Sequence, residues 1–186
     1  MTTIVGVQHK NKCVLGADNQ VTDDDGRIFR HKNMVKISQL ANGVLLAGAG
    51  EVGACDIAQH LWKPPRMTSK DKADTYHFVI SKLIPSLREC LKNNGYNFDE
   101  ERPKNDKGQR FHFLIAVNGE IFDVSEDLSV CQTDTGFYGV GNGSGYALGA
   151  LHAGATIQDA LKIAEDLDVY TSGPFLILEQ KKFNER

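Results

Sequence analysis

The chain opens with Met1-Thr2-Thr3-Ile4-Val5-Gly6-Val7 and, a few residues later, Gly16-Ala17-Asp18. Polar and apolar residues alternate from Thr2 to His9 and again from Cys13 to Asp18, a pattern typical of half-buried strands. The Lys10-Asn11-Lys12 stretch between them is polar. The chain is therefore expected to begin with a β-hairpin.

Thr2 is also a candidate nucleophile. An initiator methionine before a residue as small as threonine is normally removed, so we expect the mature chain to start at Thr2. A hydroxyl and a free α-amine would then share one residue, and the amine can take the proton from the hydroxyl. The unperturbed pKa of such an amine is about 8, and a neighbouring cation would lower it. A Met-Thr beginning is common, so this feature needs support from the rest of the chain.

Length and composition restrict the classes of protein to consider. The 186 residues suggest a single domain spanning 1–186. The 21 basic and 24 acidic residues give a net charge of −3, so neither nucleic acid nor an anionic membrane is an expected partner. The four cysteines (Cys13, Cys55, Cys90 and Cys131) lack metal-ligand spacing and fit reduced thiols. With no apolar stretch near the ~20 residues of a membrane span and no signal peptide, a cytoplasmic location is expected.

The remaining pattern predicts two groups of strands and two pairs of helices. Strands are expected at 27–29, 34–40, 43–47, 111–117, 120–124, 137–140 and 174–178, and helices at 51–61, 71–93, 145–153 and 156–167. Asn118-Gly119 is the strongest hairpin signal, and residues 97–110 suggest a surface loop. Strand groups followed by helix groups favour an α+β sandwich of two sheets with helices on both outer faces.

Several motifs occur together in a fixed order along nearly the whole chain. They are 2–7 (TTIVGV), 16–22 (GADNQVT), Asn33-x-x-Lys36, 47–50 (AGAG), 139–143 (GVGNG) and 168–171 (DVYT). This ordered set resembles the proteasome β-subunit/HslV family of N-terminal threonine peptidases, in the N-terminal-nucleophile (Ntn) hydrolase superfamily. The resemblance implies a four-layer αββα fold.

The resemblance also implies roles for individual residues. Thr2 would be the nucleophile and its α-amine the base. Lys36 would lie beside the Thr2 hydroxyl and lower the pKa of the amine, and Asp18 would pair with Lys36. Taken alone, Lys36 reads more readily as a solvated strand lysine, and Asp18 reads equally as a turn cap at a strand end.

Further roles follow for residues in the later motifs. Gly50 matches the glycine whose N–H forms the oxyanion hole, although Glu51 stands where the family often has a second glycine. Asp168 and Thr171 match an Asp-x-x-Ser/Thr pair that orders the amine. Asn142 replaces a serine that contacts the amine in the family. Asparagine can still donate and accept hydrogen bonds, and Ser144 is a possible substitute.

The substrate pocket is expected at Gly48 and Val52. Gly48 lies two positions before the oxyanion glycine, and having no side chain it would leave an empty floor. Val52 would form an apolar wall. This combination favours large apolar or aromatic residues before the cut and disfavours acidic ones.

Other kinds of site find little support. The Gly-rich run 139–145 does not fit G-x-G-x-x-G and lacks a Gly-Lys-Ser/Thr ending, so a nucleotide site is not expected. The six histidines show no zinc spacing. No cofactor and no metal are expected.

The resemblance implies a threonine endopeptidase that acts on unfolded proteins or peptides. It would work as a homo-oligomeric ring, with an ATPase unfoldase as a separate partner. Two alternatives remain open: a catalytically silent ring subunit, and an Ntn amidase that acts on a small molecule.

Overall fold

A computed structural model describes residues 2–22, 25–29, 35–98 and 110–183. Within them, an antiparallel four-stranded sheet has the order β10-β1-β2-β11, and an antiparallel five-stranded sheet has the order β5-β6-β7-β8-β9. The strands of the first sheet are β1 (Thr3–Gln8), β2 (Lys12–Ala17), β10 (Phe137–Gly141) and β11 (Leu176–Lys181). Those of the second are β5 (Ile37–Gln39), β6 (Leu45–Gly50), β7 (Phe111–Val117), β8 (Glu120–Val124) and β9 (Val130–Cys131). A separate pair joins β3 (Val21–Thr22) to β4 (Ile28–Phe29).

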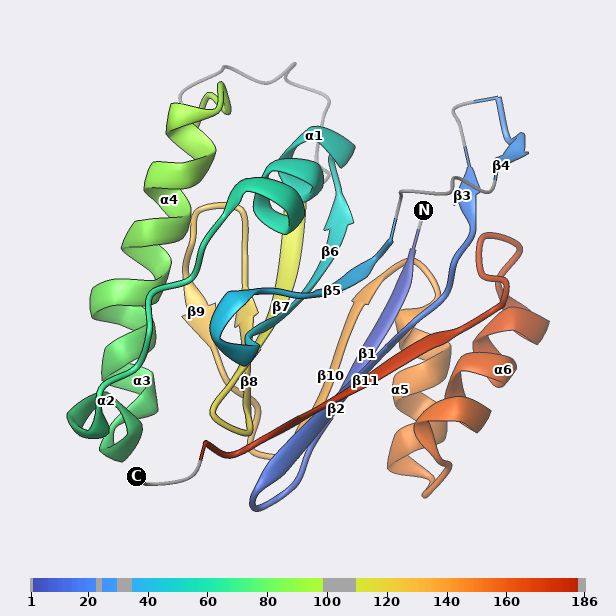
Figure 1. Cartoon of the computed structure of the whole chain (residues 1–186). Helices are drawn as coiled ribbons and strands as arrows, with labels where there is room; N and C mark the ends of the chain where they lie inside the picture. The colour runs from blue at the N-terminus through green and yellow to red at the C-terminus, as the bar shows by residue number, and fades with distance from the viewer. Residues whose placement is uncertain (1, 23–24, 30–34, 99–109, 184–186) are drawn as a thin grey trace.

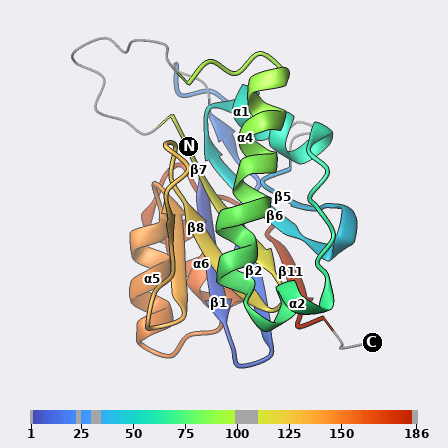
Figure 2. The ribbon, with the colours of Figure 1, turned by 90° about the vertical axis from the view of Figure 1, so that its left-hand side faces the viewer.

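Helices cover the outer face of each sheet. Figure 1 shows α5 and α6 beside the four-stranded sheet and the helices of residues 52–93 beside the five-stranded one. In Figure 2 helix α4 lies across the front of β7 and β8. The helices are α1 (Val52–Asp56), η2 (Ile57–Leu61), α2 (Ser69–Ala73), α3 (Thr75–Phe78), η3 (Val79–Leu83), α4 (Ile84–Asn93), α5 (Ser144–His152) and α6 (Ile157–Leu167), and the short turn η1 (Ala41–Gly43) joins β5 to β6.

Three apolar clusters hold the four layers together. The first, with Phe78, Leu87 and Phe113, lies between α1–α4 and the five-stranded sheet. The second, with Ile4 and Leu114, lies between the two sheets. The third packs α5 and α6 on the four-stranded sheet. Each sheet therefore buries both of its faces.

Local sequence signals placed several elements correctly. The opening hairpin forms as β1 and β2, in antiparallel register from Ile4↔Ala17 to Gln8↔Cys13. Asn118 and Gly119 adopt φ angles of 55° and 79°, as a tight hairpin turn requires. The Thr156 hydroxyl accepts the Asp159 N–H and caps α6, as expected.

The helix predicted for 71–93 is interrupted, which corrects that expectation. A capping box of Thr68 and Asp71 starts the short α2, and at Asp74 the backbone leaves the helical region. The Asp74 side chain then accepts the His77 N–H, which starts a new helix at α3. A wide π-type turn, η3, follows, and Pro85 lies just after it with no N–H to donate.

The last strand is also displaced from its predicted range. β11 begins at Leu176 rather than at Pro174, and it extends along β2 as far as Lys181↔Lys12. Proline cannot donate a ladder hydrogen bond, so the ladder starts after it. The strand β9 was not predicted. Asn33, Met34 and most of the predicted loop at 97–110 lie outside the described residues.

We find no helix in the described ranges with the length and hydrophobicity needed to cross a bilayer.

Candidate active site

Three chain segments meet at the start of β1. Thr2 directly precedes β1, Asp18 directly follows β2, and Gly141 ends β10 opposite Thr3. Thr2 is 9% exposed. A side chain at position 141 would place its Cβ 2.1 Å from the Thr2 carbonyl oxygen, so only glycine permits this close approach of the two strands.

Asp18 ties the start of the chain to Lys36. Its Oδ1 accepts the Thr3 N–H at 2.8 Å and the Lys36 ammonium at 2.7 Å, and its Oδ2 accepts the Gln20 N–H at 2.9 Å. The side chains of Lys36 and Asp18 are 8% and 0% exposed. A buried carboxylate with these three donors is satisfied, and it holds the Lys36 head group in one place.

Burial lowers the pKa of Lys36, and the carboxylates of Asp18 and Asp168 oppose that fall by favouring the ammonium form. Asp18 and Lys36 therefore form the ion pair that the resemblance implied. A buried pair of this kind stabilises a fold poorly by comparison with apolar residues of similar size. Its contact with the Thr3 N–H, one residue after Thr2, favours a functional reason for it.

A second hydrogen-bonded group reaches β1 from the other side. The Thr171 hydroxyl donates to Asp168 Oδ2 at 2.6 Å, since an ionised carboxylate can only accept. The Thr3 hydroxyl lies 2.5 Å from the Thr171 oxygen, and with the Thr171 proton already committed, Thr3 must be the donor. The order of donation is therefore Thr3 to Thr171 to Asp168.

Asn142 joins this group, and Ser144 does not. The Asn142 amide donates to Asp168 Oδ1 at 3.1 Å. The Ser144 hydroxyl instead donates to the Gly141 carbonyl at 2.7 Å, at the start of α5. Of the two candidates weighed from the sequence, Asn142 is the one that contacts the predicted Asp168–Thr171 pair.

Gly50 lies at the end of β6, with a φ of +104°. The Gly48 N–H donates to the Lys36 carbonyl at 3.0 Å, so the strand that ends at Gly50 runs alongside the residue that carries the ammonium. Glu51 has its carboxylate turned toward Arg110, with 4.0 Å between its Oε1 and the Arg110 Nε. The Glu51 carboxylate therefore has a cationic neighbour in the structure.

The expected empty floor at Gly48 is wrong. A Cβ at Gly48 would lie 2.9 Å from the Cys55 sulfur and 3.1 Å from the Phe113 ring, so these two side chains already fill that space. Burial raises the pKa of the Cys55 thiol to about 12, which keeps it uncharged. Val52 is 46% exposed and remains available as an apolar wall.

Comparison with known proteins shows which family the chain resembles. Residues 1–61 match the family model described as proteasome subunit. The chain is 28% identical over 186 residues to the ATP-dependent protease subunit HslV of Campylobacter lari, with 92% of this chain and 91% of that one covered. It is 27% identical over 190 residues to the ATP-dependent protease subunit ClpQ of Bacillus velezensis, with 96% of each covered.

The chain is thus similar to the proteasome β-subunit/HslV family.

Solved structures agree with this family's fold. BPH from Thiobacillus denitrificans matches with a TM-score of 0.68 at 22% identity, covering 99% of this chain and all of that one. The same protein in complex with epoxomicin matches with a TM-score of 0.69 at 21% identity, covering 98% and 100%. HslV from Trypanosoma brucei gives 0.64 at 17% identity, covering 97% and 99%. The predicted α+β sandwich of the proteasome/HslV fold is therefore confirmed.

Sequence reasoning missed two residues of this proteasome-like site. Thr3 supplies an N–H to Asp18 and a hydroxyl to Thr171, and it is completely buried. The signal in the sequence that could have pointed to Thr3 was a polar threonine at a position expected on the buried side of a strand. Gln20 is 2% exposed, and its side chain donates to the Val169 carbonyl at 3.0 Å, which ties the Asp18 loop to the Asp168 loop.

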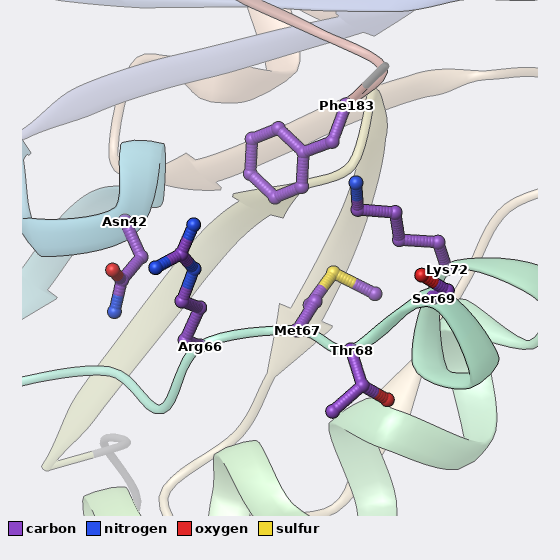
Figure 3. A pocket seen from close by; sticks show the side chains of 7 residues that line it. All are labelled: Asn42, Arg66, Met67, Thr68, Ser69, Lys72 and Phe183. Atoms are coloured by element: carbon purple, nitrogen blue, oxygen red, sulfur yellow. The ribbon is translucent and has the colours of Figure 1, made fainter. Parts of the chain in front are cut away.

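The described residues offer no metal site, because no three of their His, Cys, Asp or Glu side chains are grouped to hold an ion. A cavity of about 670 Å³ lies elsewhere (Figure 3). Asn42, on its rim, precedes β6, whereas Gly50 ends that strand. The two ends of a strand of this length are roughly 20 Å apart. None of the predicted site residues lines this cavity, whose walls are Asn42, Arg66, Met67, Thr68, Ser69, Lys72 and Phe183.

Proposed function

We propose that this chain is the subunit of an N-terminal threonine protease and that Thr2, as the first residue of the active form, is its nucleophile. The observation that carries this proposal is the buried Asp18, which binds both the Thr3 N–H and the Lys36 ammonium. Because Thr3 directly follows Thr2, we infer that this contact holds the Lys36 ammonium near Thr2. The relatives named as ATP-dependent protease subunits support the same reading.

The reaction begins with attack of the Thr2 Oγ on a peptide carbonyl while the Thr2 amine takes the hydroxyl proton. The Lys36 ammonium lowers the pKa of that amine by like-charge proximity, so more of it is free to act as base at neutral pH. The Gly50 N–H donates to the tetrahedral oxyanion. The amine then passes its proton to the leaving nitrogen, and the peptide bond breaks.

Water completes the cycle by hydrolysing the ester on Thr2. The same amine accepts a proton from the water and returns one to Oγ as the acid product leaves. The family resemblance assigns the ordering of the amine to Asp168, Thr171 and Asn142, which are hydrogen-bonded to one another. These steps need no cofactor.

The proposal about the assembly rests on the same resemblance to the family. A homo-oligomeric ring that encloses its active sites, served by a separate ATPase that delivers unfolded chains, is the arrangement we propose. A single domain over 1–186 and a cytoplasmic location stay predictions.

A mass measurement tests the function directly. We expect the purified protein to begin at Thr2 and to gain the mass of one epoxomicin per active subunit, with the adduct on Thr2. A chain that hydrolyses small amides but not peptides would instead favour the amidase. Absence of any adduct on a chain that begins at Thr2 would favour the silent ring subunit.

Cleavage preference is expected to follow the corrected pocket. Substrates with leucine or phenylalanine before the cut should be cleaved faster than those with glutamate, because Val52 supplies an apolar wall and no cation. Cys55→Ala should open space under Gly48 and raise the phenylalanine-to-leucine ratio of kcat/KM about fivefold, the effect of roughly 1 kcal/mol. Matched peptides measure this ratio.

The exposed Cys131 provides the control, since Cys131→Ala removes a thiol from β9. That variant should leave the ratio unchanged. Faster cleavage after glutamate than after leucine in the unsubstituted protein would show that the pocket is placed wrongly.

A further inference from the structure

The Gly50–Glu51 peptide contacts the main chain of Arg110. The Glu51 N–H donates to the Arg110 carbonyl at 2.6 Å. A Cβ at Gly50 would lie 2.3 Å from that same carbonyl oxygen, so the strand end fits around it only as glycine. The direction of the peptide group after Gly50 is therefore set by the position of the Arg110 main chain.

Arg110 is anchored in turn through its own polar groups. Its backbone N–H donates to the Glu126 carboxylate, and its Nη1 donates to the Asn97 carbonyl at 3.0 Å. Its side chain is 13% exposed. With its backbone N–H bound by Glu126 and its guanidinium bound by the Asn97 carbonyl, Arg110 is a firm support for the strand end that its carbonyl contacts.

The Arg110 guanidinium also faces the carboxylate of Glu51, a negative charge that would hinder the proposed reaction. Glu51 is adjacent to Gly50, and its carboxylate is 49% exposed at 4.0 Å from the Arg110 Nε. An unopposed carboxylate here would repel the oxyanion that the Gly50 N–H is proposed to stabilise. Arg110 places a positive charge next to that carboxylate.

We propose that Arg110 is a positioning residue that orients the Gly50–Glu51 peptide and neutralises Glu51 beside the oxyanion site. This inference rests on the proposed peptidase function. In this assignment Arg110 balances the negative charge of Glu51, which stands at a position where many family members have glycine.

Steady-state kinetics of single and double variants test the assignment. Arg110→Gln should lower kcat about tenfold and leave KM within about twofold, because the lost interaction acts on the transition state. Arg110→Lys, which keeps the charge, should retain kcat within about threefold of the unsubstituted protein. Adding Glu51→Gln to Arg110→Gln should recover most of the lost kcat.

The matched control is Arg66→Gln, at the rim of the distant cavity, which should change neither constant. The single variant Glu51→Gln keeps the proposal testable even if Arg110→Gln fails to fold, because it changes only a half-exposed side chain. It should raise kcat about twofold, since it removes a negative charge near the oxyanion.

Two results would overturn the inference. One is a loss in Arg110→Gln that Glu51→Gln does not relieve, and the other is a fall in kcat for Glu51→Gln alone. Epoxomicin labelling of the unsubstituted protein separates this failure from that of the function. An adduct on Thr2 with either result rejects only the role of Arg110, whereas no adduct and no peptide turnover reject both proposals.

Discussion

Thr2→Ala is expected to lower peptide turnover at least about 1,000-fold while the protein stays folded. The substitution removes the attacking oxygen, and no other group at the site can replace it. Thr2 precedes β1 and no described hydrogen bond of its side chain supports the fold, so the melting temperature should move by less than about 4 °C. Turnover of a fluorogenic peptide and a thermal melt measure the two effects.

The neighbouring Thr3 supplies the control, because it carries the same side chain one position later. The Thr3 nitrogen is committed to Asp18 and its hydroxyl proton to Thr171, so Thr3 is structural in this geometry. Thr3→Ser keeps both interactions and should retain activity within about tenfold. If Thr3→Ser abolished turnover and Thr2→Ala did not, the nucleophile would be wrongly assigned.

Short-range chemistry explains why much of the fold was predictable. The turn at Asn118-Gly119 follows from residues that tolerate positive φ, and the start of α6 follows from the Thr156 cap. Periodicity distinguished strands from helices over most of the chain. The break at Asp74 was missed because an aspartate inside an amphipathic run gives no sign of which side it will cap.

The site was predictable in its residue types and much less in its contacts. Asp18 and Lys36 came from the family's motifs, and their ion pair joins residues 18 apart in sequence. The bond from Thr3 to Thr171 spans 168 residues, and the support of Gly50 by Arg110 depends on β6 pairing with β7. Neither could be read from spacing. The filled space at Gly48 was missed because the fold turns Cys55, seven residues later, back over it.

Lys36→Ala is expected to lower turnover at least about 100-fold, because the site loses a positive charge that both lowers the pKa of the Thr2 amine and stabilises negative charge developing on the Thr2 oxygen. Lys36→Arg should also fail, since a forked guanidinium does not fit the position of an ammonium. The loss of Lys36 leaves Asp18 as an unpaired buried charge, at a cost of roughly 3–5 kcal/mol of folding free energy. Activity and stability must therefore be separated.

The double variant Lys36→Met with Asp18→Asn achieves this separation, because it removes both charges together. Its stability should recover relative to Lys36→Met alone, while turnover should stay at least about 100-fold below that of the unsubstituted protein. The exposed pair of Lys12 and Glu179, at 2.6 Å with side chains 46% and 37% exposed, is the comparison. Lys12→Ala should cost less than about 1 kcal/mol and leave turnover unchanged.

The pH dependence of the unsubstituted protein gives an independent test of Lys36. Turnover should rise with pH as the Thr2 amine loses its proton and becomes a base. It should fall again as Lys36 loses its own proton, because the site then lacks the positive charge that stabilises the reacting Thr2 oxygen. Burial lowers the pKa of Lys36, so this fall should occur below the pH expected for an exposed lysine. A bell-shaped profile of kcat/KM is the expected result. Lys36→Ala with turnover within a factor of two of the unsubstituted protein, and with the same profile, would remove Lys36 from the mechanism.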